Sequence, residues 1–224
     1  MFVGHYGPAF GAKPVASIVP LWVYFIAVQW LDVVWSVLVL CGVEKLRIVP
    51  SFTEANPYDL YYMPYTHGLP GAIVLSVALG GIVAAAIGRQ RGLVFMVVAG
   101  AAFSHWILDL IVHVPDMPLY DNTDRVGFGL WRHLILSFPL ELIVLLLGTW
   151  LYARRFPPAD KRGHWALRGF VVLLVLLQVF ANFGPPPSSN TSMAITTLSL
   201  YLALAALAAL VEHVRRGALT LAAE

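Results

Sequence analysis

Residues 92–114, GLVFMVVAGAAFSHWILDLIVHV, form a long apolar run whose only ionisable residues are His105, Asp109 and His113. About 20 apolar residues are enough to cross the hydrocarbon core of a bilayer. Within that core each backbone group must find its partner in the same segment, so such a run forms a helix. Ionisable side chains are costly at this depth and mark functional sites. This stretch therefore predicts a transmembrane helix that carries a polar site.

Further apolar runs extend this prediction along the chain; they cover about residues 18–43, 67–88, 127–153, 165–183 and 193–212. Of the 224 residues, 59% are hydrophobic and only 12% are charged, whereas a soluble domain carries about 25% charged residues. Residues 3–13 are too short to span, and we expect a short helix packed beside the first long span. We predict an all-α integral membrane protein in which residues 1–224 form one polytopic domain, a bundle of about six transmembrane helices plus the short N-terminal helix.

The basic residues predict the orientation of this bundle. If the first long span runs outward, ten of the fourteen Lys and Arg residues lie on the cytoplasmic side and four lie outside, together with an acidic loop of about residues 114–126. Loops rich in Lys and Arg stay in the cytoplasm. The first fifteen residues do not predict a cleavable signal peptide. We expect a protein of the bacterial inner (plasma) membrane whose basic loops are cytoplasmic, and a net charge of +2 gives no reason to expect nucleic acid binding.

The spacing H-x3-D-x3-H of His105, Asp109 and His113 places all three side chains on one helical face. The resulting stripe is about 12 Å long, which is too long for one metal ion to bind all three. Two metals could share Asp109, or one metal could use His105 and Asp109 with His113 outside the ligand shell. Imidazole and carboxylate ligands suit zinc, iron or manganese, and we expect a divalent ion, with zinc first.

Other ionisable residues are predicted at the same level of the membrane. His67 begins the second long span and His133 lies near the start of the fourth, both at the outer face, while Asp32 lies in the outer half of the first. A hairpin of residues 3–13 and the first span brings His5 to a depth similar to that of Asp32. We therefore predict a metal site of His5, Asp32, His67, His105, Asp109 and His113, with His133 and Glu141 as candidate catalytic residues.

Each of these residues also has a purely structural interpretation. His67 could be a residue at a helix N-terminus capped by Thr66, His133 an interfacial residue, and Glu141 a partner for Arg132. The structural interpretation needs a separate explanation for each of these residues, whereas a single metal site would explain the presence of all of them.

The order of these motifs resembles that of bacterial inner-membrane proteins described as membrane-bound metal-dependent hydrolases. The matching pieces are Gly4-His5, Asp32, Tyr65-Thr66-His67 and Ser104-His105-Trp106-Ile107-Leu108-Asp109, within roughly the first 135 residues. The family typically has Pro-Asp-x-Asp where this chain has Leu31-Asp32-Val33-Val34, so one carboxylate of that motif is absent here. The resemblance implies a metal-dependent hydrolase and names no substrate.

These observations give one leading hypothesis and three alternatives. The leading hypothesis is a hydrolase whose site, in the outer half of the bilayer, acts on a lipid-like or amphiphilic ester or phosphoester. A metal ion lowers the pKa of its bound water, and a carboxylate or His133 could act as general base. The alternatives are a metal-ion or proton transporter, a haem-binding protein with two histidine ligands, and a structural membrane protein in which the polar stripe joins helices.

Overall fold

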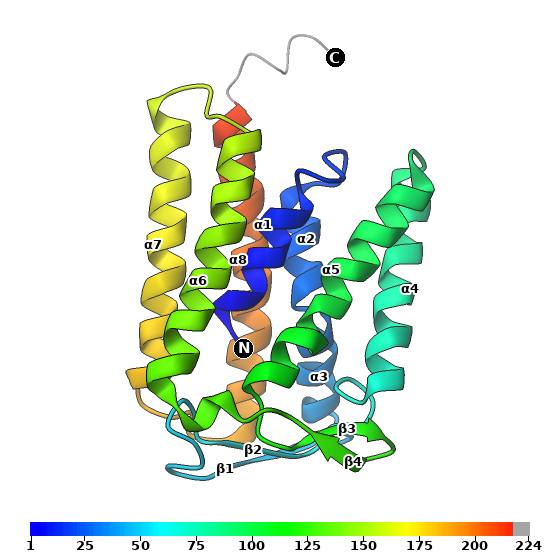
Figure 1. Ribbon diagram of the computed structural model, residues 1–224, viewed down its shortest axis with the longest axis vertical. Coiled ribbons are helices and arrows are strands. Elements are labelled where there is room, and N and C mark those ends of the chain that lie inside the picture. Colours follow the sequence, from blue (N-terminus) through cyan, green and yellow to red (C-terminus); the bar gives the residue numbers. More distant parts are fainter. Residues whose placement is uncertain (217–224) are drawn as a thin grey trace.

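The computed structural model describes residues 1–216, and long parallel and antiparallel helices dominate it (Figure 1). Five helices are long and apolar enough to cross a membrane: α4 (Leu69–Ile87), α5 (Arg91–Val112), α6 (Leu134–Arg155), α7 (Lys161–Phe183) and α8 (Asn190–Arg216). Length and composition of this kind are those of an integral membrane protein. The predicted helical character is confirmed, and five helices in the described part of the chain are long and apolar enough to be membrane spans.

The first predicted span, 18–43, is not one helix. It consists of α2 (Leu21–Val28) and α3 (Trp30–Leu40), which are bent by 55° at Gln29. The pair is apolar enough to count as a sixth, broken span. Contacts with the N-terminal segment and α5 accompany the bend: the Gln29 side chain donates to the carbonyl of Phe2 (3.3 Å), and the carbonyl of Val28 accepts from His105 (2.7 Å).

The fourth predicted span, 127–153, begins too early. Residues 127–133 form a loop with the short 3-10 helix η2 (Leu130–Arg132), and α6 starts only at Leu134. Gly129 has φ +76°, a left-handed conformation that glycine adopts at no steric cost and that ends a regular helix.

The N-terminal segment lies inside the bundle. It consists of the 3-10 helix η1 (Val3–His5) and α1 (Tyr6–Ala12), whose residues are mostly buried. The predicted short helix is therefore present, but it packs mainly against α6 rather than only beside the first span. Gly7 of α1 and Gly148 of α6 make the close approach possible, because a Cβ atom at Gly148 would lie 2.0 Å from the Gly7 carbonyl oxygen.

The two ends of the bundle differ in charge and structure. The basic end carries the turns at 13–20, 88–90 and 156–160 and the end of α8, and ten of the fourteen Lys and Arg residues belong to it (Figure 1). The hairpin end carries two antiparallel β-hairpins: β1 (Lys45–Ile48) with β2 (Tyr58–Tyr62), and β3 (Met117–Tyr120) with β4 (Thr123–Val126). The sequence predicts only a loop at 114–126, because a four-residue strand pattern is too short to be distinguished from a turn.

Aromatic residues fill the centre of the bundle between these ends. Phe10 and Phe25 pack edge to face with ring centroids 5.2 Å apart, and Tyr6, Tyr152 and Phe170 surround them. All five side chains are buried. This apolar layer lies on the basic-end side of the polar residues described next.

Candidate metal centre

The six residues predicted as metal ligands lie together in the half of the bundle nearer the hairpin end. They are His5 at the end of η1, Asp32 in the first turn of α3, His67 just before α4, His105 and Asp109 in α5, and His113 just after it. All except the partly exposed Asp32 are buried.

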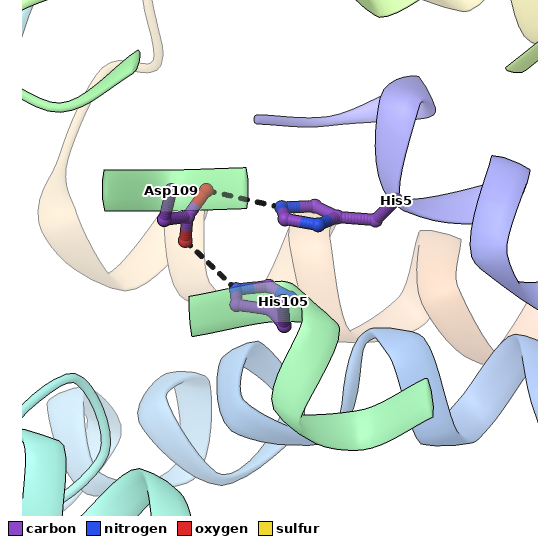
Figure 2. Close-up of side chains that lie close together, drawn as sticks. All are labelled: His5, His105 and Asp109. Carbon is purple, nitrogen blue, oxygen red and sulfur yellow. Dashed lines mark hydrogen bonds and ion pairs between the residues drawn. The ribbon is translucent and has the colours of Figure 1, made fainter. Parts of the chain in front are cut away.

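One group joins the N-terminal segment to α5 (Figure 2). His5 Nε2 lies 3.1 Å from Asp109 Oδ1, and the His5 ring stacks on the His105 ring with centroids 3.8 Å apart. The ligand atoms of His5, His105 and Asp109 all lie within 4.8 Å of one another, close enough to hold one metal ion. The amino group of Met1 also contacts Asp109.

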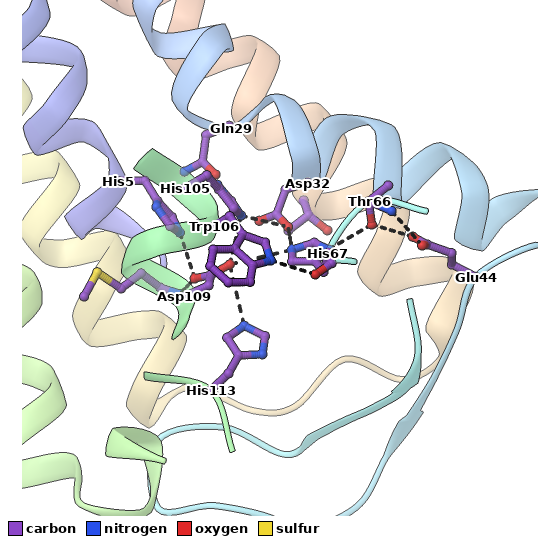
Figure 3. Close-up of polar contacts among 12 residues, drawn as sticks. His5, Gln29, Asp32, Glu44, Thr66, His67, His105, Trp106, Asp109 and His113 are labelled. Atoms are coloured by element: carbon purple, nitrogen blue, oxygen red, sulfur yellow. Dashed lines mark hydrogen bonds and ion pairs between the residues drawn. The ribbon is translucent and has the colours of Figure 1, made fainter. Parts of the chain in front are cut away.

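A second group, Asp32, His67 and His105, meets the first at His105 (Figure 3). Asp32 Oδ1 lies 3.3 Å from His67 Nε2 and 3.5 Å from His105 Nε2. Asp109 Oδ2 lies 3.6 Å and 3.0 Å from the same two nitrogens. Two carboxylate oxygens and two imidazole nitrogens therefore converge from three separate segments. Asp109 Oδ2 also lies 3.6 Å from His113 Nε2.

In three of these histidines, Nδ1, the ring nitrogen that faces away from the carboxylates of Asp32 and Asp109, makes a hydrogen bond that orients the ring. His105 Nδ1 donates to the carbonyl of Val28 (2.7 Å), which is available because α2 ends there. His113 Nδ1 contacts Asp116 Oδ1 at 2.9 Å. His67 Nδ1 lies 2.8 Å from Thr66 Oγ1, whose own proton goes to Glu44 Oε2 (2.6 Å). His67 is therefore the donor of that bond.

These partners leave Nε2 of each ring directed at the carboxylates. Metal-binding histidines are usually held in this way, with the second ring nitrogen bonded to a carbonyl or carboxylate. Within residues 1–216, His105 Nε2 is buried and makes no hydrogen bond, although Asp109 Oδ2 is only 3.0 Å away. This nitrogen therefore has a lone pair or proton without an assigned partner, and it belongs to both groups of residues that could hold a metal ion.

The charge of His67 follows from its surroundings. Its Nε2 lies 3.3 Å from Asp32 Oδ1 and 3.6 Å from Asp109 Oδ2, and the charges of these two carboxylates favour a proton on this nitrogen. In the metal-free protein a proton therefore balances part of the negative charge at this point. A metal ion would have to displace that proton.

The two predicted catalytic residues are placed differently. Glu141 is buried beside the centre, where its carboxylate accepts from the backbone amides of Phe2 (2.8 Å) and Gly4 (3.2 Å) and so anchors η1. His133 is exposed at the start of α6 and is not among the residues that form the centre.

The structure adds residues that the sequence analysis did not select. The Tyr201 hydroxyl donates to Asp32 Oδ2 (2.7 Å), and Glu44 and Asp116 orient His67 and His113. Asp116 has a sequence signal, since it lies three residues after His113. Tyr201 has none, because it lies in an apolar helical pattern far along the chain.

A cavity of about 480 Å³ adjoins the centre. Asp32, His67, Asp109 and His113 form its polar end, and most of the remaining wall is apolar and comes from α3, α7, α8 and the β1–β2 hairpin. The volume is within the range of about 300–1,000 Å³ that is usual for small-molecule sites. The centre is therefore accessible from a space large enough for an organic substrate.

Comparison with known protein families, with curated proteins and with solved structures finds no match to this chain. Its function must be argued from the chemistry of the site rather than from a relative.

Proposed function

We propose that this protein is an integral-membrane, metal-dependent hydrolase whose centre contains Asp32, His67, His105 and Asp109. The observation that carries the proposal is the convergence of Nε2 of two oriented histidines on oxygens of two carboxylates, at the end of a cavity. The motif resemblance described above points to the same class of enzyme.

The donor distances suit zinc. Ligands about 2.0–2.2 Å from a zinc ion in tetrahedral geometry lie about 3.3–3.6 Å from one another. Asp32 Oδ1 lies 3.3 and 3.5 Å from Nε2 of His67 and His105, within this range, and these three residues form one compact group. Asp109 Oδ2 lies 3.6 Å from His67 Nε2 but only 3.0 Å from His105 Nε2, and Asp109 forms its own compact group with His5 and His105. Iron or manganese would accept the same nitrogen and oxygen ligands, so zinc is the first choice and the other two are alternatives.

A divalent ion at this place would polarise a carbonyl or phosphoryl oxygen and lower the pKa of water. We assign the role of general base to His113, which lines the cavity and is oriented by Asp116. Asp116 would stabilise the imidazolium that forms when His113 takes a proton. This assignment replaces His133, which lies outside the centre.

The substrate that fits this site is a lipid-like or amphiphilic ester or phosphoester. The polar end of the cavity holds the hydrolytic residues, whereas Leu60, Leu177 and Leu200 belong to its apolar wall. A molecule with one hydrolysable polar group and an apolar tail matches both parts.

Two alternatives are less favoured by the same geometry. A transporter needs a polar path beyond the centre, but buried Tyr6, Phe10 and Phe25 pack together on the basic-end side. A haem needs a porphyrin plane between its axial ligands, but His67 and His105 both approach the same oxygens of Asp32 and Asp109.

Elemental analysis of the detergent-solubilised protein tests the metal centre. We expect at least one equivalent of zinc, iron or manganese in the parent and a loss of it in His105→Ala and Asp109→Asn. His133→Ala is the matched control, because His133 is exposed outside the centre, and it should retain the metal. A parent that binds no metal after reconstitution would exclude the proposal and leave the cluster as a hydrogen-bonded link between helices.

Hydrolysis is tested separately with chromogenic fatty-acyl esters and phosphodiesters in detergent micelles. The metal-loaded parent should cleave at least one of these classes, whereas His113→Ala should keep its metal and lose about 10²–10⁴-fold in rate, the usual contribution of a general base. A His113→Ala variant without metal would instead make His113 a ligand.

We also propose that the basic end faces the cytoplasm of a bacterial inner membrane, as its Lys and Arg excess predicts. The single cysteine, Cys41, is exposed between α3 and β1 at the hairpin end. A membrane-impermeant maleimide should therefore label Cys41 in intact cells. A Cys41→Ser, Gln90→Cys variant should be labelled only after the membrane is permeabilised, and the reverse result would invert the orientation.

A further inference from the structure

We infer that the cavity takes up one acyl chain of a membrane lipid, which enters sideways between α7 and α8. This assigns a substrate class and a route to the proposed active site, and as a statement about a substrate it rests on the proposed function.

The first observation is the composition of the wall opposite the candidate metal centre. Leu177, Phe180 and Ala181 of α7 and Met193, Thr196 and Leu200 of α8 line the cavity. One apolar space therefore runs from the polar residues near α5 to the contact between the two C-terminal helices.

The second observation is that part of this wall is also molecular surface. Phe180 is 63% exposed, and Ala181 and Thr196 are exposed as well, although all three line the cavity. The cavity thus opens on the outer face of α7 and α8. We call this opening, bounded by Phe180, Ala181 and Thr196, the portal.

The surface around the portal is suited to lipid rather than water. Four apolar residues lie within four residues of it in sequence and are exposed: Leu176, Val179, Phe183 and Ile195, with exposed fractions of 59%, 39%, 67% and 51%. Both helices are long and apolar enough to cross a bilayer. Acyl chains would surround this face, so the portal connects the hydrocarbon phase with the centre.

The charged residues that line the cavity also favour an acyl chain over a free anion. Within residues 1–216 the cavity is lined by three acidic residues, Asp32, Asp109 and Glu141, and by no Lys or Arg. A free anionic solute would meet these carboxylates and no Lys or Arg, and His67 and His113, which also line the cavity, already contact Asp32, Asp109 and Asp116. Binding of an uncharged acyl chain is favoured because it covers the apolar wall of the cavity. The polar group at the end of that chain can then reach the candidate metal centre.

Photo-cross-linking tests the route without requiring turnover. The protein would be reconstituted into vesicles of a phosphatidylcholine that carries a diazirine on one acyl chain. After irradiation, peptide mass spectrometry identifies the labelled residues. We expect adducts on Leu60 and Tyr201, which line the cavity but are only 8% and 4% exposed.

Two obstructed variants and one control complete the experiment. Thr196→Trp and Ala181→Trp narrow the portal from opposite helices, and both should lose the adducts on Leu60 and Tyr201. Ile195→Trp places the same side chain on the lipid-facing surface beside the portal, at a residue that does not line the cavity, and should keep them. Thermal unfolding and circular dichroism of each variant show whether it is folded, and two independent obstructions prevent one misfolded variant from deciding the result.

Adducts confined to surface residues such as Leu176 in the parent would overturn the inference. Adducts on Leu60 and Tyr201 that persist in both folded, obstructed variants would overturn the portal as the route. Lipid uptake in a protein that shows neither metal nor hydrolysis would disprove the proposed function but not the acyl-chain site, so the two can fail separately.

Discussion

Three histidines of the centre depend on residues that are not themselves candidate ligands. Val28, Thr66 and Asp116 fix His105, His67 and His113, and the Tyr201 hydroxyl holds Asp32. Such partners determine which ring nitrogen faces the metal, and their loss typically costs about 10–100-fold in metal affinity.

The link from Glu44 through Thr66 to His67 gives the most direct test at this scale. Thr66→Val keeps the size of the side chain but removes the acceptor for His67 Nδ1. We expect zinc affinity, measured by competition with a chromogenic chelator, to fall about 10–100-fold. Thr66→Ser should restore it. Thr123→Val, which removes a hydroxyl from the distant β3–β4 hairpin, is the control. Equal affinity in Thr66→Val and the parent would show that this link does not orient a ligand.

Metal binding should also depend on pH. The carboxylates of Asp32 and Asp109 lie beside His67 Nε2 and favour a proton on it, which a metal ion must displace. Each proton displaced by the metal makes the apparent affinity rise roughly tenfold per pH unit, up to the pKa of the group. Titration calorimetry in buffers of different ionisation enthalpy should detect proton release at about pH 7. An affinity that is independent of pH would mean that His67 does not bind the metal.

At the scale of elements, the position of η1 depends on the contact between α1 and α6. A Cβ at Gly148 would meet the Gly7 carbonyl carbon at 2.6 Å as well as its oxygen, and a Cβ at Gly7 would meet the Val144 carbonyl oxygen at 2.2 Å. These neighbours are backbone atoms and cannot rotate away. The two helices would have to separate, and His5 would move with α1.

Gly148→Ala should therefore destabilise the protein by about 1–3 kcal/mol, the usual cost of overpacking. Thermal unfolding in detergent measures this loss, and elemental analysis shows whether the displaced His5 lowers metal content. Gly100→Ala in α5 is the matched control, because a Cβ there meets nothing within 4 Å. If both variants unfold at the same temperature, the close approach of α1 and α6 is not needed for stability.

Sequence patterns predict the long helices well and their interruptions poorly. Residues 21–40 contain neither Gly nor Pro, so local propensity favours one continuous helix across Gln29. The bend coincides with contacts made by residues far away in the chain, Phe2 and His105. Tyr201 could not be predicted for the same reason: its contact with Asp32 joins α8 to α3, and such a long-range contact leaves no periodic pattern in the sequence. The H-x3-D-x3-H spacing, in contrast, is a local property of one helix and could be recognised directly.

At the scale of the whole molecule, the two terminal parts of the described chain are joined by a buried ion pair at the basic end. Lys13 Nζ lies 2.7 Å from Glu212 Oε1, and Glu212 Oε2 accepts from the backbone amide of Leu21 (2.8 Å). Both side chains are largely removed from water. The pair therefore ties the turn between α1 and α2 to the end of α8.

Lys13→Met should destabilise the protein because Glu212 keeps its charge in a buried place. Breaking a buried ion pair costs about 3–5 kcal/mol, and the loss here should be near the lower limit because Arg216 still contacts Glu212. Lys13→Met combined with Glu212→Gln removes both charges and keeps an acceptor for Leu21. This double variant should recover most of the stability in thermal unfolding. A double variant less stable than Lys13→Met would show that the charges themselves hold the two parts together.

The bond between Glu141 and the amides of Phe2 and Gly4 has a consequence for biosynthesis. The segment with His5 is made before α6, but its anchor lies on α6 and leaves the ribosome more than a hundred residues later. At about 5–20 residues per second, several seconds pass in which His5 has no fixed position and the ligands that follow it are already translated. Metal loading is thus expected to be a late event, completed only after the hairpin of α5 and α6 has been inserted.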